Sequence, residues 1–168
     1  MHVDYVIDAH KNHSKKPENA VRRWDGTTPY FMHPLWCATT MITETSLPEQ
    51  IRETGSLALL YHDVLEDTTA GLLDELPEDV RRLILEMTSE AWAVPEGSAI
   101  EMQEIWSRSP EARLLKLYDK TSNLLDGVWM PPGKHKAYVD YTRKLADDVR
   151  SRYGELNITR IAGAITSV

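Results

Sequence analysis

The segment HDVLEDT, which begins at His62, constrains the fold of this chain more than any other feature. It overlaps an apolar run at residues 57–65 and adds four ionisable side chains to it, those of His62, Asp63, Glu66 and Asp67. On a helix the last two follow one turn after the first two, so all four share one face. Because unpaired charges are costly to bury, we expect a cation to satisfy these groups inside the protein.

The composition indicates a globular chain with enough residues for one core, and we predict a single domain over residues 1–168. The formal net charge is −7. This charge argues against a partner that is a nucleic-acid polymer, but it permits a small phosphate-bearing molecule whose cleft carries local cations. Cys37 is the single cysteine, which excludes an intrachain disulfide and a cysteine-based zinc site.

Nothing in the sequence indicates secretion or a membrane partner. The first residues lack the basic start and the apolar core of a signal peptide. No apolar run approaches the roughly 20 residues that a membrane-spanning helix requires. We therefore expect a soluble, cytoplasmic protein, and the sequence does not indicate its oligomeric state.

The hydrophobic pattern is helical nearly throughout, so we predict an all-α fold, a helical bundle of about seven helices. No strand with hairpin chemistry is evident. Residues 14–28 read as a long loop and residues 90–97 as a connector. Ser98 and Glu101 fit a capping box. The expected helices cover residues 3–13, 29–45, 46–66 with Ser46 as the cap, 78–89, 98–108, 109–127 and 134–153, with a last helix capped by Asn157.

Two further residues extend the ionisable set around the HDVLEDT segment. His33 stands at the start of a predicted helix, and Asp119 interrupts an apolar run. Taken singly, His33 could cap a helix backbone and Asp119 could pair with a neighbouring lysine. Together with His62 and Asp63, they form a mixed nitrogen and oxygen donor set that suits Mn²⁺, Fe²⁺, Co²⁺ or Zn²⁺. Helical bundles build such metal sites from side chains on facing helices.

The chain also carries short motifs in a definite order. These are Ala9-His10, Arg22-Arg23, Thr28-Pro29-Tyr30, His33-Pro34, the HDVLEDT segment, Lys116-Leu117-Tyr118-Asp119-Lys120 and Asn123-Leu124. In this order they resemble the HD-domain metal phosphohydrolases, and within them the RelA/SpoT-type alarmone hydrolases. The small single-domain members, which include the animal SpoT homologues, are the most similar. The resemblance covers roughly residues 5–155 and implies an HD-domain helical bundle.

The resemblance also implies a role for each matching residue. The implied metal ligands are His33, His62, Asp63 and Asp119, with Mn²⁺ as the cofactor. Glu66 and Asp67 match the acidic pair that handles the attacking water and the proton transfer. The implied substrate-binding residues are Arg22, Arg23, Tyr30, Lys120, Asn123, Lys134 and Tyr138. The implied reaction removes the 3′-pyrophosphate of a guanosine or adenosine alarmone such as ppGpp and releases pyrophosphate.

The chain departs from the family pattern in its longer polar loop at residues 11–21, and in Trp24, Tyr118 and Lys134, where other residue types are usual. These departures leave the implied metal ligands intact. Two alternatives stay open, namely a phosphohydrolase that acts on another nucleotide such as NADPH or a nucleoside phosphate, and a non-catalytic nucleotide-binding HD domain. We expect Trp129 to lie in the core or at an interface rather than against a substrate.

Overall fold

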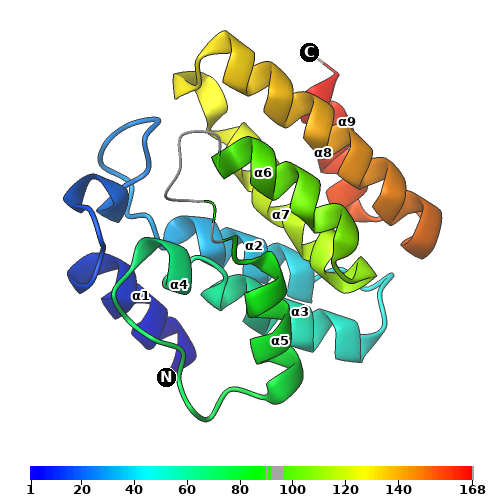
Figure 1. Ribbon diagram of the computed structural model, residues 1–168. Coiled ribbons are helices and arrows are strands. Elements are labelled where there is room, and N and C mark those ends of the chain that lie inside the picture. The colour runs from blue at the N-terminus through cyan, green and yellow to red at the C-terminus, as the bar shows by residue number, and fades with distance from the viewer. Residues whose placement is uncertain (90, 92–96, 168) are drawn as a thin grey trace.

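The computed structural model describes residues 1–89, 91 and 97–167, and these fold into α-helices without a β-strand (Figure 1). The all-α prediction is therefore confirmed. Within the same residues no helix is both long and apolar enough to cross a membrane. The α-helices are α1 (His2–Asn12), α2 (Met32–Ile42), α3 (Glu49–Tyr61), α4 (Val64–Asp67), α5 (Glu78–Met87), α6 (Gly97–Glu104), α7 (Pro110–Leu125), α8 (Pro132–Tyr153) and α9 (Asn157–Thr166). Short 3₁₀ helices cover Pro17–Ala20, Ile105–Ser107 and Gly127–Trp129.

Helix α7 runs through the middle of the bundle (Figure 1). It packs against α2, α3, α5, α8 and α9, and residues 112–122 are all buried. A helix that is covered on every side usually carries apolar residues all round. Here Lys116, Asp119 and Lys120 are buried too, so the centre of the fold contains charge that other residues must balance.

The apolar core packs around this charged centre. Leu59, Leu114, Leu117 and Leu145 are wholly buried in it, together with Cys37. At roughly 25 cal/mol per Å² of apolar surface removed from water, such side chains supply most of the driving force for folding. Cys37 thus packs as a small core residue.

The predicted helix over residues 46–66 divides into α3 and α4. His62 and Asp63 lie at the junction, with backbone angles that remain in the right-handed helical region. The Asp67 amide still donates to the Asp63 carbonyl at 2.9 Å. The acidic pair therefore follows the His-Asp pair by one turn, as the spacing predicts, although the regular helix is interrupted. This division is one reason that the described residues hold more helical segments than the seven or so predicted.

Several predicted boundaries are wrong by a few residues. Helix α3 begins after Pro48, so Ser46 is not its cap. Helix α6 begins at Gly97, one residue before the expected cap Ser98. Asn157 is the first residue of α9 and Leu156 precedes it as the cap. The predicted loop over residues 14–28 contains a 3₁₀ turn, and most of the predicted connector at 90–97 lies outside the described residues.

Ser109 caps the N-terminus of α7. The Ser109 hydroxyl accepts a hydrogen bond from the Ala112 amide at 3.1 Å and itself donates to a carboxylate oxygen of Glu86. We expect Ser109→Ala to lower the free energy of unfolding by about 1 kcal/mol, whereas Ser109→Thr keeps the cap. Urea unfolding of the three proteins measures the effect. Equal stability of the alanine and threonine variants would contradict the capping role.

Candidate metal centre and active-site cleft

Four of the predicted site residues come together where α2, α7 and the α3–α4 junction meet. Nε2 of His33 lies 3.4 Å from Oδ2 of Asp63 and 3.4 Å from Oδ1 of Asp119. Nε2 of His62 lies 3.2 Å from Oδ1 of Asp63 and 3.9 Å from Oδ1 of Asp119. All four side chains are buried. Residues separated by up to 86 positions in the sequence thus turn their polar ends toward one small volume.

The imidazole rings of His33 and His62 are each oriented through Nδ1, and their Nε2 atoms make no hydrogen bond. Nδ1 of His62 donates to the Leu59 carbonyl at 2.7 Å, and Nδ1 of His33 lies 2.8 Å from the Ser122 hydroxyl. Both Nε2 atoms are buried without a hydrogen-bond partner. A ring that donates through Nδ1 presents the lone pair of Nε2, which is how histidines are arranged around metal ions.

The donor set therefore fits a metal ion. One ligand atom each from His33, His62 and Asp119 can be chosen so that all three lie within 4.8 Å of one another. Asp63 is not part of that tight group, although its two carboxylate oxygens face the two imidazole rings. Nitrogen and oxygen donors of this kind hold divalent transition metals. A buried cluster that could hold a metal ion is thus present, and the inclusion of Asp63 among the ligands stays a prediction.

The electrostatics of the cluster favour a cation as well. Burial opposes ionisation of Asp119, but Lys120 and Lys116 outweigh it and hold the pKa of Asp119 well below its usual range. Burial also opposes ionisation of Asp63, and the two histidines outweigh it, so the pKa of Asp63 is lowered. Burial alone would lower the pKa of His62, yet the carboxylates raise it to about 9. A field that draws a proton to this point also draws a metal cation.

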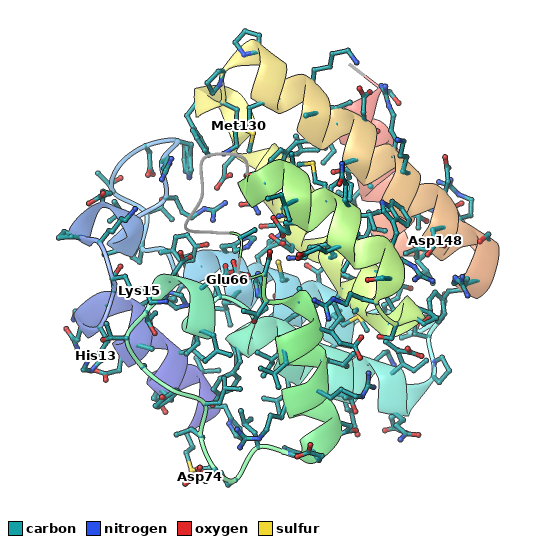
Figure 2. All side chains as sticks on the ribbon, viewed as in Figure 1. His13, Lys15, Glu66, Asp74, Met130 and Asp148 are labelled. Carbon is teal, nitrogen blue, oxygen red and sulfur yellow. The ribbon has the colours of Figure 1, made fainter. Side chains whose placement is uncertain are left out.

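A cleft of about 400 Å³ opens beside the cluster. Asp63 and Asp119 reach its surface, together with the acidic pair Glu66 and Asp67. Figure 2 shows Glu66 near the middle of the molecule, whereas His13, Asp74 and Asp148 lie at its edge. The two predicted carboxylate ligands and the two predicted catalytic acids therefore share one cavity large enough for a small molecule.

The two acids differ in their surroundings. Oε1 of Glu66 accepts a hydrogen bond from the Ser89 amide at 2.8 Å, and burial still raises the pKa of Glu66. Burial, and after it the negative charge of Asp63, raises the pKa of Asp67 to about 7. A carboxyl group whose pKa lies near 7 can hold or release a proton at neutral pH.

Three of the predicted substrate residues make hydrogen bonds within the protein. Arg22 binds Asp126 through two hydrogen bonds of 2.6 and 2.8 Å and donates to Asn123 at 3.1 Å. Asn123 in turn donates to Oδ1 of Asp119 at 2.6 Å. Tyr30 lies beneath the Arg22 guanidinium and donates to Oδ2 of Asp63 at 2.8 Å. All three line the cleft, so they form its wall and orient the presumed metal ligands.

The other predicted substrate residues, Arg23, Lys120, Lys134 and Tyr138, form a shelf of cations and aromatic rings together with Trp129. We call these five residues the cation shelf. The Arg23 guanidinium and the Lys134 amine lie 5.0 and 5.1 Å from the centre of the Trp129 ring. The amines of Lys120 and Lys134 lie 5.3 and 5.5 Å from the centre of the Tyr138 ring. All but Lys134 line the cleft. Trp129 packs against the hydrophobic cluster of Leu124, Met130, Tyr138 and Val139, as expected for a core residue, and it also lines the cleft.

Sequence reasoning missed four residues that complete the site. Trp129 supports the cation shelf, Ser122 orients His33, and Asp126 holds Arg22. Glu101 was assigned to a capping box, but its Oε1 accepts a hydrogen bond from Lys116 and forms an ion pair with Lys120. The sequence offered one signal for Glu101, because two buried lysines one turn apart on an apolar helix require an acidic partner.

No protein-family model matches the chain. The chain is 29% identical to guanosine-3′,5′-bis(diphosphate) 3′-pyrophosphohydrolase MESH1 of Drosophila melanogaster over 140 residues, which are 78% of this chain and 76% of that protein. It is 32% identical to the human MESH1 protein over 131 residues, which are 74% of this chain but 66% of the human one. Mouse MESH1 matches equally well, at 32% identity.

A solved structure of a metazoan SpoT orthologue, described as hydrolysing ppGpp, shares the fold with a TM-score of 0.73. The alignment covers 99% of this chain and 92% of that one, at 24% sequence identity. The fold, the order of the motifs and these relatives agree with one another. The chain therefore belongs to the family of SpoT-like, MESH1-type hydrolases with a helical HD-domain fold.

Proposed function

We propose that this protein is a metal-dependent hydrolase that removes the 3′-pyrophosphate from a ppGpp-type guanosine or adenosine alarmone and releases pyrophosphate. The observation that carries the proposal is the pair of buried histidine Nε2 atoms that face two carboxylates without a hydrogen-bond partner. The MESH1 relatives are named for this reaction, which supports the same substrate here.

We assign the metal to His33, His62, Asp63 and Asp119, with Mn²⁺ as the first candidate because it accepts mixed imidazole and carboxylate donors. A bound divalent cation lowers the pKa of water and neutralises charge on a phosphoryl group. The protein's own contribution is to fix the donors. Ser122 and Leu59 orient the two rings, and Tyr30 and Asn123 each donate to one ligand carboxylate.

The acidic pair handles the protons. Hydrolysis adds one water across the bond between the ribose 3′ oxygen and the pyrophosphate, so one group must take a proton and another must return one. The amide of Ser89 stabilises the ionised form of Glu66, which suits a base. Asp67, whose pKa lies at about 7, is the better donor to the leaving ribose oxygen.

The cation shelf favours a substrate that carries several phosphate groups. In a chain of net charge −7, Arg23 and Lys120 reach the cleft from separate segments, and Lys134 lies beside it against the Trp129 ring. The amine of Lys120 is paired with Glu101 and Asp119, so we assign direct phosphate contacts to Arg23 and Lys134. Each phosphate group gains most from its own charged donor. Arg22 is held by Asp126, so we assign it to shaping the cleft wall instead of binding phosphate directly.

The proposed substrate also defines the partner and the location of the protein. The partner is a small phosphorylated nucleotide, and neither a nucleic-acid polymer nor a membrane is needed. We place the activity in one domain over residues 1–168 and in the cytoplasm. The oligomeric state is left open.

The proposal is tested by product analysis with Mn²⁺ present. We expect pyrophosphate and a nucleoside 5′-diphosphate from ppGpp, because the shelf holds the remaining phosphates while the acids serve the bond that is cut. A panel of ppGpp, NADPH and nucleoside 5′-monophosphates is separated by chromatography after incubation. Orthophosphate as the sole phosphate product, or faster cleavage of NADPH or a monophosphate than of ppGpp, would assign the site to another nucleotide.

A pair of variants separates metal binding from proton transfer. Asp63→Ala should lose stoichiometric Mn²⁺ and all turnover, because it removes a ligand carboxylate. Glu66→Gln should keep the metal and lose about 100-fold in kcat, the usual scale for general acid–base catalysis. Metal content by mass spectrometry and ppGpp turnover are measured on both. Full metal content in Asp63→Ala, or near-normal turnover in Glu66→Gln, would refute the respective role.

The raised pKa of Asp67 predicts a pH dependence of stability in protein freed of metal by a chelator. A carboxyl with a pKa of 3.8 when unfolded and about 7 when folded stabilises the fold at low pH and loses that contribution as pH rises through 7. At about 1.4 kcal/mol per pKa unit the loss reaches roughly 4 kcal/mol.

Asp67→Asn keeps a neutral side chain at every pH. Its free energy of unfolding relative to the wild type should therefore rise between pH 4 and pH 7 and stay level above pH 8. Urea unfolding at a series of pH values measures the difference. A constant difference over this range would show that Asp67 has an ordinary pKa in the folded protein.

A further inference from the structure

Glu101 is an acidic residue in the wall of a cleft that otherwise gathers cations for phosphate. Its Oε1 lies 2.6 Å from the amine of Lys116 and 2.9 Å from the amine of Lys120. Its side chain is only 16% exposed. Helix α6 thus supplies a single carboxylate that both buried lysines of α7 share.

The same two lysines contact the presumed metal ligand Asp119. Their amines lie 3.2 and 3.3 Å from Oδ2 of Asp119. The other oxygen, Oδ1, faces His33 and His62 and accepts from Asn123. The carboxylate of Asp119 therefore has two sides, one turned to the lysines and one to the histidines.

Charge balance depends on Glu101. Two carboxylates and two ammonium groups form a closed, neutral set in the order Glu101, Lys116, Asp119 and Lys120. Without Glu101, two buried ammonium groups would share one carboxylate. The excess positive charge would sit beside the ligand and oppose the approach of a divalent cation, because electrostatic interactions in a buried site are weakly screened.

We propose that Glu101 is a positioning residue that raises metal affinity by neutralising the positive charge that Lys116 and Lys120 place on the Oδ2 side of Asp119. This inference rests on the metal site of the proposed function. Glu101 acts through the lysines and does not itself contact the metal ligands in the described contacts. Residues that orient a metal ligand from behind typically change metal affinity by 10- to 100-fold when they are replaced.

The test is calorimetric titration of Mn²⁺ into four proteins: the wild type, Glu101→Gln, Lys116→Met, and the double variant. We expect Glu101→Gln to weaken binding at least about 10-fold. Lys116→Met removes one positive charge and keeps a side chain of similar volume. The affinity of this variant for Mn²⁺ should equal or exceed that of the wild type. The double variant restores neutrality and should recover most of the affinity. Glu53→Gln, at an exposed residue of α3, is the charge-matched control.

The outcomes separate this inference from the proposed function. A wild type that binds no divalent metal overturns the metal site and the proposed function with it. A wild type that binds Mn²⁺ while Glu101→Gln binds it equally well overturns only the role of Glu101. If both single variants weaken binding and the double variant is weaker still, the effect is lost packing and charge balance is refuted.

If Glu101→Gln does not fold, the sign of the Lys116→Met effect decides the matter, together with the conservative variant Glu101→Asp. The proposal predicts that Glu101→Asp, which keeps the charge, stays within a few-fold of wild-type affinity. A loss of 10-fold or more in Glu101→Asp together with weaker binding by Lys116→Met would contradict it.

Discussion

The structure depends on the convergence of two imidazole rings and two carboxylates inside an apolar helical bundle. Nothing about hydrophobic packing alone requires these groups to be buried, and each of them costs free energy when it leaves water. Hydrogen bonds and ion pairs to neighbouring residues offset this cost. Among the side chains of His33, His62, Asp63 and Asp119, the buried atoms without a hydrogen-bond partner are the two Nε2 atoms, which face the carboxylates.

The arrangement of helices follows from this convergence. Helix α7 must pass through the centre of the bundle for Asp119 to reach the histidines, and this carries Lys116 and Lys120 into the interior. Helix α6 then supplies Glu101 to balance them. The stretch across the junction of α3 and α4 supplies ligands at its start and the acids of the cleft one turn later.

Much of the fold and the inner site could be predicted from the sequence because their signals are local. Helical periodicity placed most helices, and the HDVLEDT segment placed four site residues. The contacts around the cleft wall and the cation shelf could not be predicted, because they join distant segments. Arg22 looked like a phosphate ligand, yet its partner Asp126 lies 104 residues away. Ser122 and Trp129 gave no local signal, and Glu101 satisfied a capping pattern that α6 does not use.

The measurement that tests the account most directly is a crystal structure grown with Mn²⁺, with anomalous scattering recorded at the manganese edge. The account predicts one strong anomalous peak bonded to Nε2 of His33, Nε2 of His62 and a carboxylate oxygen of Asp119, with Asp63 beside it. A peak elsewhere in the cleft, or histidines hydrogen-bonded to the carboxylates with no peak between them, would contradict the account.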